Sequence, residues 1–600
     1  MTPPRQYRLL MLLLISLPCL FVGCGKTKPT PVTTNTKTKE AVDPWPRAVS
    51  ALRKDADLVV CQRVLNELNA AIPATPADDH PQALLAEVVA EIRKLLNLGD
   101  DESKELQSVS FTPLDAHYLT ECLYLRDIAR TLDVASAPPA QRARIAFEWV
   151  CRHVVLAPWR LPMPPGETLR RGAGSGLDRA YVFAAIASQL DLEVYFVGQS
   201  GAIDWKATHI PAGQKDAKGP FWAVAVRDGD EFLLYDPWRG EPIPGANPDR
   251  PATLAEVRAK PETVAVWLDN KAVPWDVGKE DLRAGELYVA LPMSASAGRL
   301  RLLESKLKTD TGVRLFTDLI ARLESAKTAA KGVPVRVWSP ARDPFCLTNI
   351  LRAYLSPTEG GIGVEKVEAI QASQLPRASL FAPPAGMTNP EALNTLMAVV
   401  LSRYAESFMK LPTPRERIQR GNFITTAESL YTLRDEFTKR AAQLQVDEKK
   451  EQTLKEFVDR AEQFFGKTVL AMRADPAVNP PALVNAAVGG FFKDHLAGME
   501  VALDGQQSKG MLAEATFLLA MGKHERAERI QRAYERTSRL ADGKETASAR
   551  LAANDEWSAA LDLWQQYDRQ AEVQKADFPG RAEHARRLTA RATQMAAATR

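Results

Sequence analysis

The stretch GAGSGLDRAYVF, residues 172–183, decides the fold that we expect for the middle of this chain. Its glycine-rich turn follows the proline-rich break Leu161–Gly166 and leads into an apolar segment, Asp178–Leu190. A turn of this kind before an apolar run of about 13 residues is typical of a helix N-terminus. The segment therefore predicts a helix that packs on a core.

Strands are predicted directly after this helix. Leu192–Val197 alternates in the pattern of a strand. Phe221–Val226 and Phe232–Tyr235 flank Asp228-Gly229, a dipeptide that favours a hairpin turn. A helix packed on antiparallel strands predicts an α+β domain.

The same residues resemble the core of the bacterial transglutaminase-like superfamily. The resemblance rests on Gly174–Phe183, on Leu190–Val194 and on the later Asp236-Pro237, and it covers roughly residues 110–245. It implies a papain-like α+β fold with a triad of cysteine, histidine and aspartate. The cysteine would stand at the helix N-terminus, where the dipole and the free N–H groups favour a thiolate.

This chain departs from that pattern at two of the three triad positions. The nucleophile position falls on Gly176, and the histidine position falls on Phe221 or its neighbours Pro220 and Trp222. The aspartate position is retained as Asp236. Without a thiol no acyl-enzyme can form, and without an imidazole no group is left to take up the proton. We therefore predict a retained fold without catalysis and without a cofactor.

Two rescue sites keep an enzyme alternative open, namely an active thiol hydrolase or acyltransferase of the same fold. Ser175 could act as the nucleophile, although the pattern places no base beside it. Cys151, His209 and Asp236 keep the chain order of a triad, but Cys151 is expected in the middle of a helix, where no free N–H groups can form an oxyanion hole. A core cysteine and a solvated histidine are the simpler interpretation.

An inactive site of this type could bind a peptide or a cell-wall fragment without cleaving it. Trp222 and Phe221 would line the cleft, Arg170 and Arg171 would offer partners for carboxylates, and Asp236 would accept hydrogen bonds. The alternative is that Trp222 fills the vacated pocket as part of the core and that Asp236 closes a turn, because aromatic residues on strands are usually packing residues.

The N-terminal residues predict a lipoprotein. Arg5 and Arg8 precede the apolar run Leu9–Val22, which is too short to span a bilayer and has the length of a signal-peptide core. Residues 21–24, Phe-Val-Gly-Cys, resemble the bacterial lipobox, which implies cleavage before Cys24 and acylation of that cysteine. The expected location is the cell envelope, extracytoplasmic and lipid-anchored to a bacterial membrane through Cys24. An ordinary secretory signal is the alternative.

The composition of the 600 residues, 45% apolar and 25% charged, is that of a multi-domain globular protein. A formal charge of +3 gives no basic surplus, so the expected partners are the membrane and a protein or peptide, and not nucleic acid. Cys61, Cys122, Cys151 and Cys346 are widely spaced and show no Cys-x-x-Cys pattern, so we expect no metal site. We interpret these cysteines as buried hydrophobic residues, with one or two disulfides as the alternative.

The predicted organisation has a helical lead, an α+β domain and a mostly α-helical C-terminal half. The regions are a signal peptide (1–23), a flexible tether (24–46), an N-terminal helical region (47–109), the transglutaminase-like domain (110–250), a mixed α/β region (251–382) and a helical region (383–600). In the last region, Met521–Ala527 and Asn554–Ala560 are similar and lie 33 residues apart, which is close to the tetratricopeptide period of about 34. A generic helical bundle is the alternative there.

Overall fold

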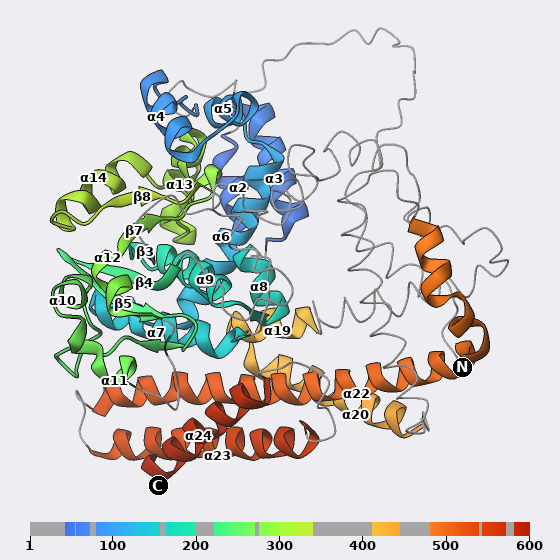
Figure 1. Ribbon diagram of the computed structural model, residues 1–600. Coiled ribbons are helices and arrows are strands. Elements are labelled where there is room, and N and C mark those ends of the chain that lie inside the picture. The colour runs from blue at the N-terminus through green and yellow to red at the C-terminus, as the bar shows by residue number, and fades with distance from the viewer. Residues whose placement is uncertain are drawn as a thin grey trace, which may run out of the picture. The chain divides into compact units, whose positions relative to one another are not determined.

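The structure is a computed structural model of the 600-residue chain (Figure 1). It describes residues 43–53, 56–72, 80–156, 164–198, 221–269, 275, 277–339, 411–443, 480–538, 543–571 and 581–599. The predicted signal peptide, Cys24 and nearly all of the predicted tether lie outside these residues, as do His209, Pro220 and Cys346. The chain divides into two units, Met1–Asp43 and Pro44–Arg600, and the description below concerns the second.

Helices and strands alternate irregularly along the first part of this unit. Up to residue 198 they are α2 (Trp45–Leu52), α3 (Leu58–Ala71), α4 (Ala86–Leu96), α5 (Asp100–Gln107), α6 (Pro113–Thr131), α7 (Pro139–His153), β1 (Val155–Leu156), α8 (Pro165–Arg171), β2 (Ala173–Gly174), α9 (Gly176–Gln189) and β3 (Val194–Gly198). The later elements are β4 (Phe221–Asp228), β5 (Glu231–Asp236), β6 (Glu241–Pro242), α10 (Leu254–Ala259), η4 (Pro261–Val264), α11 (Ala265–Leu268), α12 (Lys279–Ala284), β7 (Glu286–Val289), η5 (Met293–Ser296), α13 (Gly298–Thr311), α14 (Leu319–Ala329) and β8 (Val335–Val337). The C-terminal part consists of α19 (Pro412–Gln419), α20 (Phe423–Gln443), α22 (Pro480–Ser538), α23 (Gly543–Ala571) and α24 (Arg581–Thr599).

In the described part of the chain, α-helices predominate and are combined with a small mixed sheet and with the separate parallel pair β1 and β2. The sheet has the strand order β6-β5-β4-β3-β7-β8, antiparallel throughout except for the parallel pair β7 and β8. The predicted hairpin is confirmed as β4 and β5, with Gly229 at φ +63° in the turn. The strand predicted from Leu192 begins two residues later, at Val194, because Leu192 still belongs to the turn that follows α9.

The sheet extends across the domain boundary that the sequence placed at residue 250. Phe196 of β3 pairs with Tyr288 of β7, and Tyr288 pairs with Arg336 of β8. Two strands of the predicted mixed region thus complete the sheet of the predicted transglutaminase-like domain. The sequence could not show this, because a strand's pattern records which face is buried and not which strand it pairs with.

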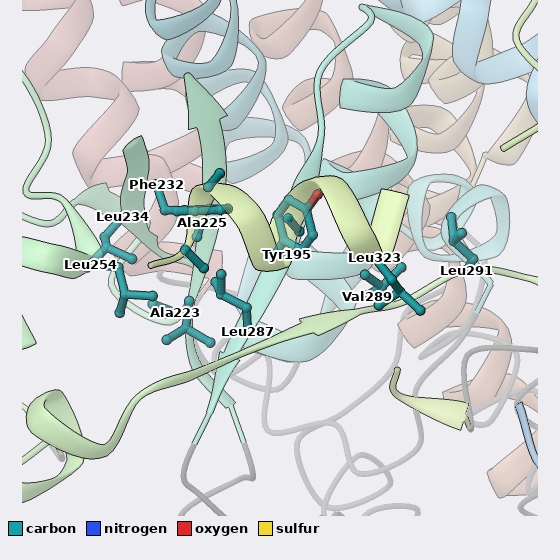
Figure 2. Packing of buried hydrophobic residues seen from close by; sticks show 14 of the residues in the cluster. Tyr195, Ala223, Ala225, Phe232, Leu234, Leu254, Leu287, Val289, Leu291 and Leu323 are labelled. Carbon is teal, nitrogen blue, oxygen red and sulfur yellow. The ribbon is translucent and has the colours of Figure 1, made fainter. Parts of the chain in front are cut away.

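Both faces of the sheet are buried. One cluster joins β3, β4 and β5 to α6, α7 and α9, and Phe147 and Phe183 meet there edge to face at 5.3 Å. The other cluster lies against α4, α10, α12 and α14, and Figure 2 shows Ala223, Ala225 and Leu234 within it. Burial on both sides explains why β4 is apolar without interruption from Phe221 to Val226.

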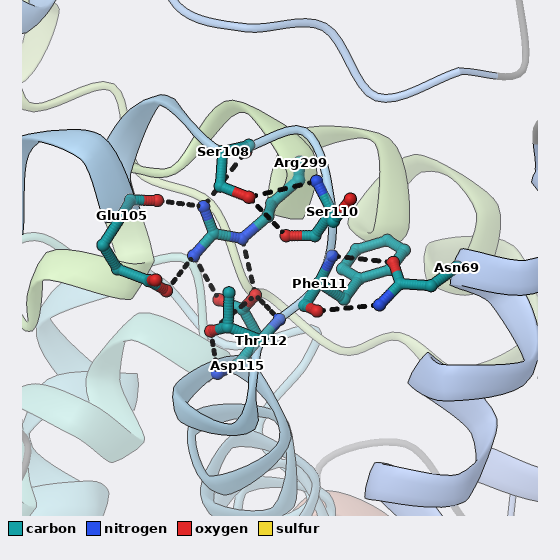
Figure 3. Close-up of polar contacts among 8 residues, drawn as sticks. All are labelled: Asn69, Glu105, Ser108, Ser110, Phe111, Thr112, Asp115 and Arg299. Atoms are coloured by element: carbon teal, nitrogen blue, oxygen red, sulfur yellow. Dashed lines mark hydrogen bonds and ion pairs between the residues drawn. The ribbon is translucent and has the colours of Figure 1, made fainter.

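A buried arginine connects the helical lead to this core. Helix α6 begins at Pro113, with Thr112 as its N-cap. Arg299 of α13, 1% exposed, donates to both carboxylate oxygens of Asp115, at 2.5 and 3.0 Å, and to Oε1 of Glu105 at 2.8 Å (Figure 3). Its remaining hydrogen bonds reach the carbonyls of Glu105 and Ser108. The buried charge is therefore paired and hydrogen-bonded, as such a group must be.

The described C-terminal helices form an antiparallel bundle. Phe517 of α22 meets Trp564 of α23 at 5.3 Å, whereas Lys523, further along α22, pairs with the earlier Glu556 of α23 at 3.3 Å. The two similar segments, Met521–Ala527 and Asn554–Ala560, therefore face each other across helices that run in opposite directions. Equivalent parts of successive repeats would run in the same direction, so this packing favours the bundle alternative. No helix in the described part of the chain, including the long α22, has a stretch apolar enough to cross a bilayer.

A buried polar interface joins this bundle to the end of α7. The guanidinium of Arg152 donates to both carboxylate oxygens of Glu525, at 2.7 and 3.3 Å. His153 lies between Trp149, on which its ring stacks at 4.0 Å, and Glu525, which its Nε2 approaches to 3.4 Å. His584 of α24 donates its Nε2 proton to the carbonyl of Arg152 at 2.8 Å, since a carbonyl can only accept.

This interface should make the protein sensitive to acid. Burial lowers the pKa of His524 to about 4, against the opposing effect of Glu528, and it lowers the pKa of His584 to about 3. Below pH 6.5 His524 and His584 bind protons in the unfolded chain but not in the folded chain, so the contribution of these two histidines to stability falls as the pH decreases. We expect a loss of about 2 kcal/mol per histidine between pH 6.5 and 5, measured by denaturant unfolding.

The variant His584→Gln isolates one of these contributions. Glutamine can still donate to the carbonyl of Arg152 but does not titrate, so its unfolding free energy should depend less steeply on pH below 6.5. If the unfolding free energy of the variant depended on pH as steeply as that of the unmodified chain, His584 would not take up a proton on unfolding.

Candidate functional site

The N-terminus of α9 is built by local sequence. Gly172 ends α8 at φ +70°, and an added Cβ there would lie 2.9 Å from Nε of Arg415 and closer to the rest of its guanidinium. Ser175 caps α9: its Oγ accepts from the backbone N–H of Asp178 at 3.1 Å, and Oδ2 of Asp178 accepts from the N–H of Ser175 at 2.8 Å. The hydroxyl of Ser175, weighed above as a rescue nucleophile, is therefore engaged in a capping box.

The predicted nucleophile position is covered by an indole ring. Gly176 is the first residue of α9, and the side chain of Trp238 lies directly against its Cα. A Cβ at residue 176 would lie 2.5 Å from Cγ of Trp238 and closer to two further ring atoms. Real Cβ atoms do not approach carbon this closely, so no side chain fits at residue 176 while Trp238 stays in place. Trp238, two residues after Asp236, is thus the residue that closes this position.

Asp236 is buried and holds the turn that carries Trp238. Its Oδ1 accepts from the backbone N–H groups of Trp238 at 2.7 Å and Arg239 at 3.0 Å, and its Oδ2 accepts from Nε1 of Trp275 at 2.7 Å. Burial raises the pKa of Asp236 to about 6, although these three hydrogen bonds and Arg239 act in the opposite direction. The carboxylate has the role of closing a turn, which was one of the two interpretations left open by the sequence.

The predicted histidine position lies in the core. Phe221 packs between Phe196, Tyr288 and Trp338, with ring centroids 4.9 to 5.5 Å away. Trp222 follows at an irregularity in the pairing of β4 with β3 and lies in the cluster on the other face of the sheet. Its indole is 8% exposed, and its Nε1 has no hydrogen-bond partner among the described residues. Trp222 is therefore largely a core residue.

The alternative nucleophile, Cys151, is half-buried and lies in an electrostatic environment that does not favour a thiolate. It lies in the last turn of α7, and not in the middle of the helix as expected, so the helix carbonyls and not its N–H groups surround it. Burial raises the pKa of its thiol to about 11, although Arg179 and Arg152 lower it. Cys61, Cys122 and Cys151 are free thiols, and the first two are buried. A thiol with this pKa is protonated at neutral pH and is a poor nucleophile.

Arg170 and Arg171 have surroundings different from those of Trp222 and Asp236. Arg170 pairs with Glu167 at 2.6 Å and with Glu416 of α19. Arg171 is 4% exposed, donates to the carbonyl of Ala173 at 2.6 Å and lies 3.7 Å from the carboxylate of Asp178. Both guanidinium groups are therefore held by the protein itself. Of the five side chains predicted for one cleft, Trp222 and Asp236 both contact Trp275, whereas the other three have different neighbours.

Two residues that the sequence did not single out organise this region. Arg179 is buried in α9 and donates to the carbonyls of Val154, at 2.8 Å, and Pro237, at 3.1 Å. It thereby connects the end of α7 to the turn at Asp236. Trp275 meets Trp267 edge to face at 5.1 Å and holds the second oxygen of Asp236. An arginine among the apolar residues of a predicted helix was the one signal that could have identified Arg179.

The predicted nucleophile position has no side chain, and the hydroxyl of Ser175 donates to Oδ2 of Asp178 at 3.0 Å as part of the capping box. In the part of the chain that the structure describes, no group of three or more histidine, cysteine or acidic side chains could hold a metal ion. Comparisons with protein-family models, with curated proteins and with solved structures give no match to this chain.

Filling residue 176 should strain the protein. Gly176→Ala places a methyl group inside the contact distance of Trp238, and we expect it to destabilise the fold by about 1–3 kcal/mol. Gly522→Ala in α22 is the matched control, because an added Cβ there meets Ile418 at an ordinary 3.5 Å and alanine favours a helix. Denaturant unfolding of both variants measures the difference, and equal stabilities of the two would show that Trp238 moves aside at little cost.

Proposed function

We propose that this chain is a membrane-anchored, extracytoplasmic lipoprotein whose transglutaminase-like α+β domain is non-catalytic. Its role is that of a scaffold or of a module that binds a peptide or a cell-wall fragment. The observation that carries this proposal is the contact between Trp238 and Gly176, because it replaces the attacking group of such a domain by a packed ring. The burial of Phe221 at the histidine position supports the same conclusion.

The packing around Asp236 explains how such a domain could keep its fold after losing its chemistry. In a catalytic triad the aspartate orients an imidazole. Here the three hydrogen bonds to Asp236 come from two backbone N–H groups and from the indole of Trp275. The carboxylate thus stabilises the turn of residues 236–239, which places Trp238 on α9. A structural use of this aspartate is independent of catalysis.

The enzyme alternative is tested at Cys151. In the full-length chain in detergent at pH 7, we expect a thiol-directed probe to label Cys151 at least about 100-fold more slowly than free cysteine, because its pKa is raised to about 11. Site-resolved mass spectrometry distinguishes Cys151 from the other cysteines, and Cys151→Ala identifies its signal. Labelling in denaturant is the control for probe access. Labelling of the folded chain as fast as free cysteine would support an active thiol enzyme.

The membrane part of the proposal is tested at Cys24. In a bacterial host that processes lipoproteins, we expect the chain to incorporate a labelled fatty acid and to sediment with membranes, because several acyl chains anchor a protein stably. Cys24→Ser should abolish both incorporation and sedimentation while leaving secretion intact. Acylation that persists in this variant would contradict the assignment of Cys24.

A further inference from the structure

The larger of two cavities described in this structure lies away from residue 176. It has a volume of about 860 Å³ and lies among α6, α8, α19 and the start of α3. Sites for small ligands usually measure about 300–1,000 Å³ and contain a few converging polar groups. The lining is rich in charge of both signs, including Asp57, Glu121, Glu167, Arg170 and Arg417.

The acidic groups of this cavity are not all neutralised. Arg170 is shared between Glu167, at 2.6 Å, and Glu416. Glu121 of α6 is half-buried, and its Oε2 accepts a hydrogen bond from the backbone N–H of Gly166 at 3.0 Å. Its Oε1 has no hydrogen-bond partner among the described residues. Burial raises the pKa of Glu121 to about 7, although Gly166 and Arg170 lower it. A carboxylate in this position would gain from a cation beside it.

A guanidinium on the same cavity offers the opposite charge. Arg417 lies in the last turn of α19 and is exposed, and its side chain has no ion-pair partner in the part of the chain that the structure describes. Arg420, in contrast, pairs with Asp127 at 3.3 Å. Among the charged groups that line the cavity, the half-buried carboxylate of Glu121 and the guanidinium of Arg417 thus have no ion-pair partner among the described residues.

We propose that this cavity binds a zwitterionic peptide segment, with a primary ammonium group at Glu121 and a carboxylate at Arg417. A guanidinium binds a carboxylate through paired hydrogen bonds, and a half-buried carboxylate binds an ammonium more strongly than an exposed one does. This inference rests on the proposed function as a binding module and specifies its ligand and its place. The site is separate from the cleft around Trp222 that the sequence favoured.

Binding at Glu121 has a proton balance that can be measured. At pH 7 a fraction of Glu121 carries a proton, which must leave when an ammonium group takes its place. The ligand keeps its own proton, so the released proton goes to the buffer. The enthalpy of binding should therefore depend on the ionisation enthalpy of the buffer at pH 7 and much less at pH 9, where Glu121 is already ionised.

The test is isothermal titration calorimetry on the full-length chain in detergent with Nα-acetyl-Ala-Lys, which carries one ammonium and one carboxylate. Two matched ligands each lack one charge: the Nε-acetylated form and the C-terminal amide. We expect saturable binding of the parent dipeptide and affinities at least about tenfold weaker for both modified forms.

Variants assign the two charges to residues. Glu121→Gln keeps an acceptor for the N–H of Gly166. It should lower the affinity for the parent dipeptide at least about tenfold, and it should abolish the release of a proton on binding. Arg417→Gln should weaken the binding of the parent dipeptide but should leave the affinity for the C-terminal amide unchanged. Glu91→Gln and Arg63→Gln, both exposed and outside the cavity lining, are matched controls and should bind as the unmodified chain does.

The failure of this inference is distinguishable from that of the proposed function. Absence of saturable binding, or unchanged affinity in Glu121→Gln, would overturn the assignment of the cavity, while the unreactive Cys151 and the acylated Cys24 would still support a non-catalytic lipoprotein. Rapid labelling of Cys151 together with tight dipeptide binding would instead overturn the non-catalytic role and leave the cavity assignment intact.

Discussion

The contact between the indole of Trp238 and the bare Cα of Gly176 is the constraint on which the central site depends. It requires glycine at the first position of α9, and it requires the turn of residues 236–239 to hold the indole there. Asp236 stabilises that turn, because its Oδ1 accepts hydrogen bonds from the backbone N–H groups of Trp238 and Arg239. Arg179 adds a second connection from α9 to the carbonyl of Pro237. The helix N-terminus is thus sealed by packing, in a place where a thiol enzyme would need open space.

Buried ion pairs connect distant parts of the chain to this centre. Arg299 connects α13 to α5 and α6, and Arg152 connects α7 to α22. The Arg299 guanidinium is matched by carboxylate and carbonyl oxygens and the Arg152 guanidinium by the carboxylate of Glu525, so removal of one partner would leave a buried charge uncompensated. Such pairs contribute less to net stability than to the choice of which surfaces meet. The helical lead and the C-terminal bundle are therefore positioned by specific polar contacts as well as by apolar packing.

The two regions weighed for function differ in how completely the protein satisfies its own polar groups. Around Asp236 every carboxylate oxygen has an internal donor, and the neighbouring aromatic rings fill the space. Around Glu121 one oxygen and the nearby Arg417 have no internal partner, and the space between α6, α8 and α19 remains open. Unsatisfied polar groups beside a cavity are the usual condition for recognising a ligand. A helix N-terminus sealed by packing and a separate open cavity thus coexist in one chain.

The sequence by itself determined the local elements, because caps, turns and apolar periodicity act over a few residues. Thr112 and Pro113 are the local start signal of α6, the apolar segment Asp178–Leu190 predicted the helix that is α9, and Asp228-Gly229 predicted the β4–β5 hairpin. It also established that residue 176 has no side chain. Only the tertiary structure decided that Trp238 covers residue 176, that β7 and β8 complete the sheet, and that Arg170 lines a cavity beside α19. These contacts join residues between 48 (Leu287 and Val335) and 246 (Arg170 and Glu416) positions apart, and a local pattern carries no information about which distant surface will bury it.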